Sequence, residues 1–175
     1  APTLTGIYEA NLYMESIEGI AVAGNYAYLI ASESGLMIVD ISDPSSPNLV
    51  GGYDTDGYAF DVAVSDNYAY VANDENGLMI IDVSNPSSPA LAGYYDTAGW
   101  AYDVAVADNY VCVADSENGL LIFGSGTTEV NVDFVSRFGG HIGNFAISGD
   151  YAYIGQGQDL VVLDITDVSS PSELG

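Results

Sequence analysis

Positive charge is almost absent from this sequence. Its 175 residues include 25 acidic side chains, a single arginine (Arg137) and no lysine, for a formal net charge of −24. Without a basic patch the chain cannot neutralise phosphate groups, which excludes nucleic-acid binding and direct attraction to anionic lipid. Because almost no carboxylate has a cationic partner, the acids must be solvated, hydrogen-bonded to the backbone or neutralised by metal ions.

Cysteine, histidine and long apolar runs are equally scarce. One cysteine and one histidine are too few for a zinc or haem site. Cys112 stands where three similar segments have a tyrosine, and it is predicted to be a small buried hydrophobe rather than a nucleophile. No apolar run approaches the roughly 18 residues of a membrane span, so no membrane insertion is expected.

The chain is rich instead in short apolar segments separated by turns. In residues 57–89, apolar runs with many β-branched and aromatic residues alternate with turn residues, a pattern typical of β-strands. An Asn-Tyr or Asp-Tyr pair recurs at steps of 42, 42 and 41 residues, beginning at Asn25, Asn67, Asn109 and Asp150. A period in the low forties with about four short strands per unit indicates the blades of a β-propeller.

The sequence therefore predicts an all-β fold, a β-propeller built of four four-stranded blades of about 42 residues, in a single domain spanning residues 1–175. The predicted units are residues 1–47, 48–89, 90–131 and 132–175. Residues 1–10 match residues 88–97, so we expect them to form an outer strand that leads into the innermost strand of a blade.

The two ends of the chain repeat the same strand segment. Residues 170–175 are in phase with residues 1–6, as if a fifth outer strand were beginning. Three arrangements fit: a ring of four blades closed within the chain, an eight-bladed ring of two chains, or terminal strands that pair with a neighbour in a filament. The terminal residues expected to take part in assembly are Pro2, Leu4, Gly6, Pro171, Leu174 and Gly175.

The third strand of each unit carries a common apolar motif. It reads LMIVD from Leu36, LMIID from Leu78, LLIFG from Leu120 and LVVLD from Leu160, and a Pro-Ser-Ser-Pro segment follows the first two. These segments resemble the LVIVD repeat, a family of propeller-like repeats in secreted and surface proteins of bacteria and archaea. The resemblance implies a propeller fold and a location outside the cell, but no specific activity.

No catalytic motif is recognisable in the sequence. A hydrolase triad needs a histidine, and His141 occupies a loop position that aromatic residues hold in two other units, which favours a packing role. No glycine-rich nucleotide-binding loop leads from a strand into a helix. With 25 acids, any chosen pair of carboxylates is uninformative about glycoside hydrolysis. We therefore expect no enzyme, and a carboxylate- and calcium-dependent enzyme is the least favoured alternative.

Three ring-bearing residues are candidates for binding. Tyr58, Trp100 and His141 are predicted to lie on loops that emerge at one face of the propeller. Large side chains with polar tips suit sugar stacking or protein contact. The other interpretation is that they simply pack between neighbouring blades.

Two acidic residues are candidates for binding a metal. Asp61 and Asp103 are predicted to open inner strands, with Gly19 and Asn144 at the matching positions. Because inner strands line the channel of a propeller, the two carboxylates are expected to hold water or a cation such as Ca²⁺, which prefers oxygen ligands. The alternative is that each acid accepts hydrogen bonds from its adjacent turn.

Together these patterns favour a non-catalytic, extracellular or cell-surface β-propeller repeat protein of a prokaryote. It is expected to act in self-assembly or protein interaction, as a structural surface or filament subunit or in adhesion, and to form a homo-oligomer or filament through its terminal strands. Ca²⁺ is its one candidate cofactor. The alternative is a lectin-like propeller that binds a glycan with the loops around Tyr58, Trp100 and His141.

Overall fold

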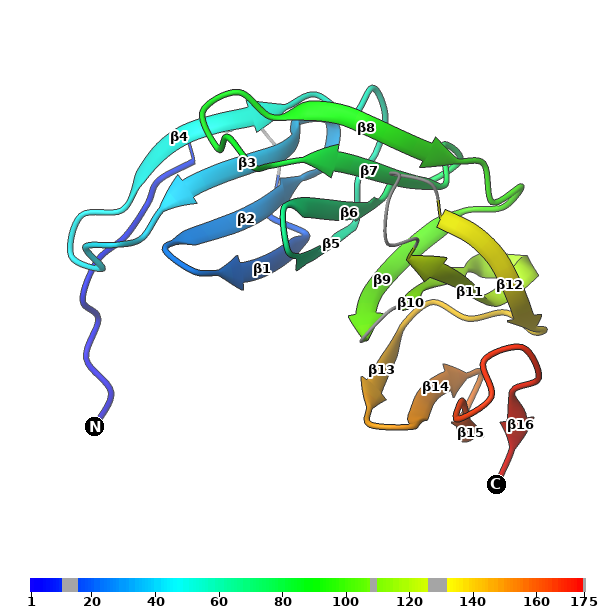
Figure 1. Ribbon diagram of the computed structural model, residues 1–175. Coiled ribbons are helices and arrows are strands. Elements are labelled where there is room, and N and C mark those ends of the chain that lie inside the picture. Colours follow the sequence, from blue (N-terminus) through cyan, green and yellow to red (C-terminus); the bar gives the residue numbers. More distant parts are fainter. Residues whose placement is uncertain (11–15, 108–109, 126–131, 175) are drawn as a thin grey trace.

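The computed structural model describes residues 1–10, 16–107, 110–125 and 132–174. In these residues the strands form four antiparallel sheets of four strands each (Figure 1). The strands of each sheet are consecutive in the chain, so every sheet is a meander that folds back on itself through hairpins. The predicted all-β fold of four four-stranded blades is confirmed.

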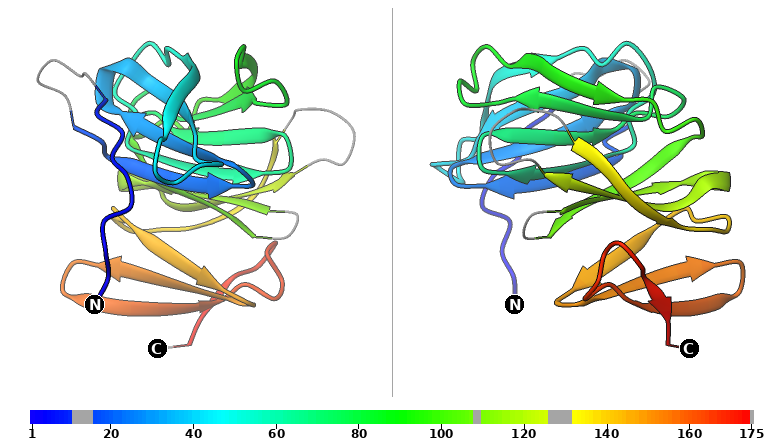
Figure 2. Two further views of the ribbon diagram at one scale, coloured as in Figure 1. Left: turned by 90° about the vertical axis from the view of Figure 1, so that its left-hand side faces the viewer. Right: turned by 45° about the vertical axis from the view of Figure 1, so that its right-hand side comes forward.

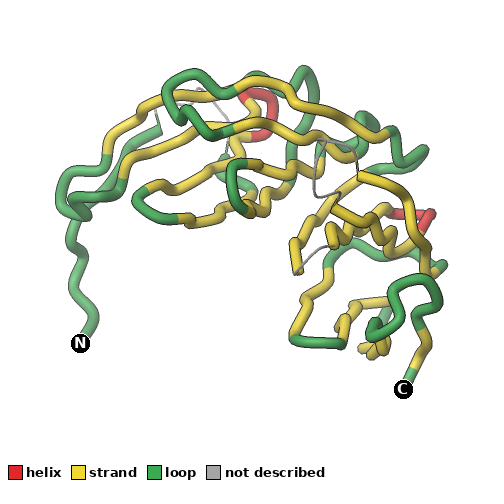
Figure 3. The backbone as a smooth tube through the Cα atoms, in the orientation of Figure 1, coloured by secondary structure: helices red, strands yellow, loops and turns green. Residues whose placement is uncertain are grey.

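The blades follow one another along the chain, and loops and short turns make up almost all of the remaining backbone (Figure 3). Blade 1 contains β1 (Gly19–Ala23), β2 (Tyr26–Ala31), β3 (Gly35–Asp40) and β4 (Asn48–Tyr53). Blade 2 contains β5 (Asp61–Ser65), β6 (Tyr68–Ala72), β7 (Leu78–Asp82) and β8 (Ala90–Tyr95). Blade 3 contains β9 (Ala101–Ala107), β10 (Tyr110–Asp115), β11 (Gly119–Ser125) and β12 (Val132–Phe138). Blade 4 contains β13 (Phe145–Ser148), β14 (Tyr151–Gln156), β15 (Asp159–Asp164) and β16 (Ser172–Glu173).

Each predicted sequence unit joins the outer strand of one blade to the three inner strands of the next, because the repeat begins at the outer strand. Residues 1–10 are the exception. The sequence predicts that they form such an outer strand, but they form no strand in the structure. A strand needs a neighbour to complete its hydrogen-bond ladder. Residues 1–10 have the sequence of an outer strand, but in this structure they belong to none of the four sheets.

The acidic residue that ends the repeated apolar motif accepts local hydrogen bonds. Oδ1 of Asp40 accepts from the backbone N–H of Ser42 at 2.8 Å, and Asp82 and Asp164 make the same contact two residues on. These hydrogen bonds lower the pKa of the carboxyl groups, which helps to keep them ionised. Some of the acidic side chains thus stabilise the turns after the third strands through local hydrogen bonds with the backbone.

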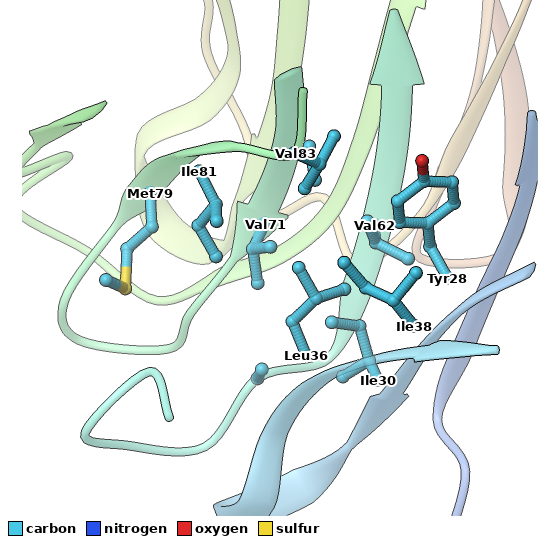
Figure 4. Close-up of a cluster of buried hydrophobic side chains, with 11 residues drawn as sticks. Tyr28, Ile30, Leu36, Ile38, Val62, Val71, Met79, Ile81 and Val83 are labelled. Atoms are coloured by element: carbon cyan, nitrogen blue, oxygen red, sulfur yellow. The ribbon is translucent and has the colours of Figure 1, made fainter. Parts of the chain in front are cut away.

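The core lies between the blades, where the faces of neighbouring sheets pack together. Between blades 1 and 2, Ile30, Leu36 and Ile38 contact Val62, Val71 and Ile81 (Figure 4). Similar clusters join blade 2 to blade 3 and blade 3 to blade 4. Cys112 belongs to the last of these and is buried as predicted, and burial raises the pKa of its thiol to about 12.

The four blades form an open arc. The innermost strands contact one another in the order β1, β5, β9 and β13, and Figures 1 and 2 show blade 1 and blade 4 at opposite ends of the arc. In this structure the chain therefore does not close into a four-bladed ring, which was one of the three arrangements that fitted the sequence. Among the described residues, no helix is long and apolar enough to cross a membrane.

Glycines allow the outer strand of one blade to approach the next blade closely. A Cβ added at Gly51 in β4 would lie 2.1 Å from the carbonyl oxygen of Pro86, in the loop that follows β7 of blade 2. We expect Gly51→Ala to lower the free energy of unfolding by about 1–3 kcal/mol, because the two backbones must move apart. Denaturant unfolding measures the change.

The matched control is Gly139→Ala, since nothing lies within 4 Å of a Cβ at Gly139. This variant should unfold at nearly the same denaturant concentration as the unchanged protein. Equal stability of the Gly51→Ala and Gly139→Ala variants would contradict the close approach of the blades.

Candidate functional site

The three predicted ring residues occupy equivalent places, each just before or near the innermost strand of a blade. Tyr58, Trp100 and His141 each precede a residue whose backbone N–H donates to a carbonyl oxygen of the preceding blade. The pairs are Ala59 with Ser32 at 3.1 Å, Ala101 with Asp74 at 3.0 Å and Ile142 with Ser116 at 3.0 Å. The accepting residues all have positive φ, so a conserved turn geometry in each blade holds the next loop in place.

The structure does not bring the three rings into a single pocket. The hydroxyl of Tyr58 donates to the carboxylate of Glu33 in blade 1. Trp100 meets Tyr102 edge to face, with ring centroids 6.5 Å apart. His141 is exposed and belongs to the loop before β13. Each ring thus lies at a different junction between blades.

Trp100 lines a pocket of about 260 Å³ between the loop that joins blade 2 to blade 3 and residues 116–118 of blade 3. Its indole is 54% exposed, and Glu117 and Asn118 of the short 3₁₀ helix Ser116–Asn118 line the same pocket. The amide of Asn118 donates to the carbonyl oxygen of Thr97 at 3.2 Å, which fixes its position. Sequence reasoning missed Glu117 and Asn118, although the same Glu-Asn pair recurs at Glu75 and Asn76.

A second pocket, of about 350 Å³, lies at the junction of blades 1 and 2. Its walls include the acids Asp54, Asp56, Glu75 and Asp96, beside Tyr94 and Met79. Even so, no three His, Cys, Asp or Glu side chains of the described residues come together as a metal site would require. The pocket is acidic, and nothing in its geometry selects a particular ligand.

Asp61 and Asp103 connect the inner strands of successive blades. Oδ2 of Asp61 accepts from the backbone N–H of Val104 at 3.1 Å, and Oδ2 of Asp103 accepts from that of Phe145 at 2.8 Å. Each carboxylate therefore reaches the next blade. Gly19 holds the matching place in blade 1, where a Cβ would lie 2.8 Å from Oδ1 of Asp61.

The environment of Asp61 favours its protonated form. Burial and a hydrogen bond with Asp103 raise the pKa of Asp61 to about 7. Two neighbouring carboxyl groups without a cation share a proton most easily. The described residues supply only this pair here, so the Ca²⁺ expected from the sequence stays a prediction.

The predicted assembly residues lie at the two ends of the arc. Gly6 lies against blade 1, where its Cβ would be 2.2 Å from the carbonyl oxygen of Pro44, and Pro2 and Leu4 belong to the same segment. At the other end Pro171 precedes β16, and the backbone N–H of Leu174 donates to the carbonyl of Val162 at 2.8 Å. Gly175 lies outside the described residues.

Two sheet faces at the ends of the arc expose large apolar side chains, a feature that the sequence analysis did not identify. On blade 1, Ile20 and Val22 are 62% and 63% exposed. On blade 4, Leu160 is 67% exposed, and Tyr151 and Tyr153 are also exposed. We define the blade-1 end face as the exposed Ile20 and Val22 with Met37 and the buried Leu29 beside them, and the blade-4 end face as the exposed Tyr151, Tyr153 and Leu160 with the partly exposed Val162.

Comparison with known families gives one match. A family model described as the LVIVD repeat matches residues 16–55, 56–97, 98–123 and 139–175. The resemblance found in the sequence is thus confirmed over most of the chain. A search of curated proteins finds no match.

Solved structures show the same fold at low sequence identity. The crystal structure of the computationally designed Ika4 protein is 10% identical, with a TM-score of 0.69, and the alignment covers 100% of this chain and 99% of that one. The periplasmic gluconolactonase PpgL of Pseudomonas aeruginosa is 14% identical, with a TM-score of 0.75. That alignment covers 92% of this chain and 53% of the gluconolactonase, so the arc spans about half of its length. At these identities the likeness concerns the fold alone.

The protonation of Asp61 predicts a pH dependence of stability. The folded protein holds a proton at Asp61 up to a pH of about 7, whereas the unfolded chain releases it near pH 4. The stabilisation from this proton is present below about pH 4 and is lost as the pH rises towards about 7. The side chain at position 61 stays neutral in Asp61→Asn, so we expect this variant to lose the dependence. As the pH rises from about 4 to about 7, the melting temperature of the variant should therefore increase relative to that of the unchanged protein.

The control for Asp61→Asn is Asp66→Asn, which removes the same charge from an exposed turn. Its melting temperature should run parallel to that of the unchanged protein across the pH range. Parallel curves for Asp61→Asn as well would show that folding does not raise the pKa of Asp61.

Proposed function

This chain belongs to the LVIVD repeat family, and from its structure we propose that it is a non-catalytic interaction protein of the prokaryotic cell exterior. It works as a structural or adhesive repeat unit that joins other protein surfaces through the end faces of its arc. The repeat defines a propeller scaffold, on which function depends on the particular surfaces presented.

The observation that carries this proposal is the exposure of both end faces. In blades 2 and 3 the residues at matching positions are buried or partly buried against a neighbouring blade, whereas Ile20, Val22 and Leu160 are more than 60% exposed. Contiguous apolar surface of this kind marks sites of protein contact on soluble proteins. Each fully buried Leu or Ile stabilises a contact by roughly 1.5–3 kcal/mol, so both faces favour a partner.

Composition supports a location outside the cell. The chain has 25 acids and one arginine, so trypsin has a single site at which to cut it, even when it is partly unfolded. A strongly acidic surface keeps a protein soluble in the salt-rich surroundings of a cell. Both properties suit the secreted and surface proteins that the resemblance to the LVIVD repeat implies.

The test uses the native protein that carries this sequence, on intact cells of its host. We expect an antibody to label the outside of the cells, and a carboxyl-directed cross-linker to join the protein into complexes at least twice its own mass. A lysine-directed reagent is unsuitable because the sequence has no lysine. Labelling only after the cells are opened, or a cross-linked product of single-chain mass, would overturn the proposal. Repeating the experiment with a chelator tests whether Ca²⁺ contributes.

The pocket at Trp100 favours a second candidate function, glycan binding. A half-exposed indole beside a carboxylate and an amide offers a stacking surface and hydrogen-bonding groups for a sugar. On this hypothesis Trp100→Ala weakens binding to a glycan found in an array screen by at least about tenfold, which corresponds to about 1.4 kcal/mol.

Tyr94→Ala serves as the control, since Tyr94 is an exposed aromatic residue that lies outside the Trp100 pocket. It should leave glycan affinity unchanged. An array without any bound glycan, or equal losses in the two variants, would dismiss the lectin alternative.

A further inference from the structure

We propose that the two end faces bind one another, so that the blade-4 end face of one copy packs on the blade-1 end face of a second copy of this chain. This inference rests on the proposed function and names the partner. The contact is head to tail, since two different surfaces meet, and it continues the blade-to-blade packing that the chain already makes three times.

The blade-4 end face has the residues of a face that packs on a following blade. Tyr151, Tyr153, Leu160 and Val162 match four residues of blade 2 by their position in the repeat. The matching residues, which pack against Val104, Val111 and Leu121 of blade 3, are Tyr68, Tyr70, Leu78 and Ile80. Blade 4 therefore presents the same chemistry, and in this structure Tyr151, Tyr153 and Leu160 are exposed.

The blade-1 end face has the residues of a face that receives a preceding blade. Ile20, Val22, Leu29 and Met37 match residues of blade 2 that contact blade 1, and Figure 4 shows three of these. The matching residues are Val62, Val64, Val71 and Met79. Because the substitutions are between aliphatic side chains of similar size, blade 4 of a second copy can pack on this face as blade 1 packs on blade 2.

Asn144 continues the series of hydrogen bonds between inner strands. Asp61 accepts a hydrogen bond from the backbone N–H of Val104, the residue after its counterpart Asp103 in the next blade. Asp103 accepts one from the backbone N–H of Phe145, the residue after its counterpart Asn144. Asn144 holds this place in blade 4 and is exposed. By the same geometry its side-chain oxygen accepts from the backbone N–H of Ile20 in the second copy. Because Asn144 carries an amide, this hydrogen bond forms without adding a carboxylate to the contact between the two copies.

Residues 1–10 already lie where the outer strand of a preceding blade belongs. Gly6 approaches Pro44 as Gly51 approaches Pro86, with Cβ positions 2.2 and 2.1 Å from the respective carbonyl oxygens. Tyr8 packs on blade 1 as Tyr53 packs into the junction with blade 2. Residues 1–10 thus lie beside the surface of blade 1 on which blade 4 of the second copy packs.

The outer edge of blade 4 has room for the end of this segment. In blade 1 Tyr53 pairs with Leu36, and the matching residue of blade 4 is Leu160. Residues 172–174 already pair with Val162, Leu163 and Asp164, at the places that match residues 3–5. Tyr8 of the second copy can therefore lie opposite Leu160 and residues 7–10 can extend the strand that β16 begins, while residues 1–6 of that copy must leave this edge to residues 170–174.

Head-to-tail contact between copies leads to one of two assemblies. Two copies give eight blades, within the four to eight of known propellers, and the ring closes if the rotation per blade allows it. Otherwise the contact propagates into a filament. Each copy carries a charge of −24, whereas the end faces are uncharged, so added salt should strengthen the association by screening the repulsion.

The test compares single substitutions on the two end faces of the 175-residue chain. Leu160→Glu blocks the blade-4 end face and Ile20→Glu blocks the blade-1 end face, and both side chains are exposed, so each variant should fold normally. Leu91→Glu, on the exposed outer strand of blade 2, is the matched control. Sedimentation and light scattering at about 0.15 M and about 1 M salt give the masses.

We expect the unchanged protein and Leu91→Glu to have at least twice the single-chain mass of 18.3 kDa at the higher salt. Leu160→Glu and Ile20→Glu should each be monomeric alone, and an equimolar mixture of the two should form a complex of two chains, because one intact face of each kind remains. Circular dichroism and thermal unfolding verify that the variants are folded.

Monomeric unchanged protein at both salt concentrations, association of either variant alone, or failure of the mixture to associate would each overturn the head-to-tail contact. Large complexes on native cells combined with a monomeric purified chain would remove the second copy as the partner and leave the proposed function standing. Single chains in both experiments would remove both.

Discussion

Packing of sheet faces between blades is the interaction on which the rest of this structure depends. A four-stranded sheet with two apolar faces needs cover on both, and between the blades of this chain each sheet covers its neighbour. Ile30 and Leu36 are fully buried because blade 2 lies against them, whereas Ile20, on the opposite face of the same blade, is exposed. The buried core and the exposed end faces thus have one cause, which is the stacking of similar units along an arc.

Hydrogen bonds that acidic side chains accept from backbone N–H groups help to align that stack. Asp61 and Asp103 each connect an inner strand to the next blade, and Asp40 organises the turn after a third strand. The chain has almost no cationic side chains to neutralise its acids, so backbone N–H groups take that place. Burial raises the pKa of Asp61, and the hydrogen bond with the neighbouring carboxyl group of Asp103 raises it further.

Much of the fold was predictable from the sequence, since the strand signals are local. The apolar runs at β2 and β6 and the breakers between them recur with a constant period, so strand positions and blade number follow directly. The candidate sites were less predictable. The rim position of Trp100 follows from the repeat, but the contribution of Glu117 to its pocket requires the turn that brings the 3₁₀ helix beside it. The hydrogen bond from Val104 to Asp61 could not be predicted from local sequence, because the two residues are 43 positions apart.

The sequence by itself determined the repeat, the four four-stranded sheets, the burial of Cys112 and the extreme negative charge, because these depend on residue type and on spacing along the chain. Only the tertiary structure decided that the arc stays open, that residues 1–10 form no strand, and that Ile20 and Leu160 remain exposed. The physical reason is that a repeat specifies how each blade packs on its neighbour, whereas closure depends on the rotation summed over all blades. That sum is a property of packed sheets in space, and no local segment encodes it.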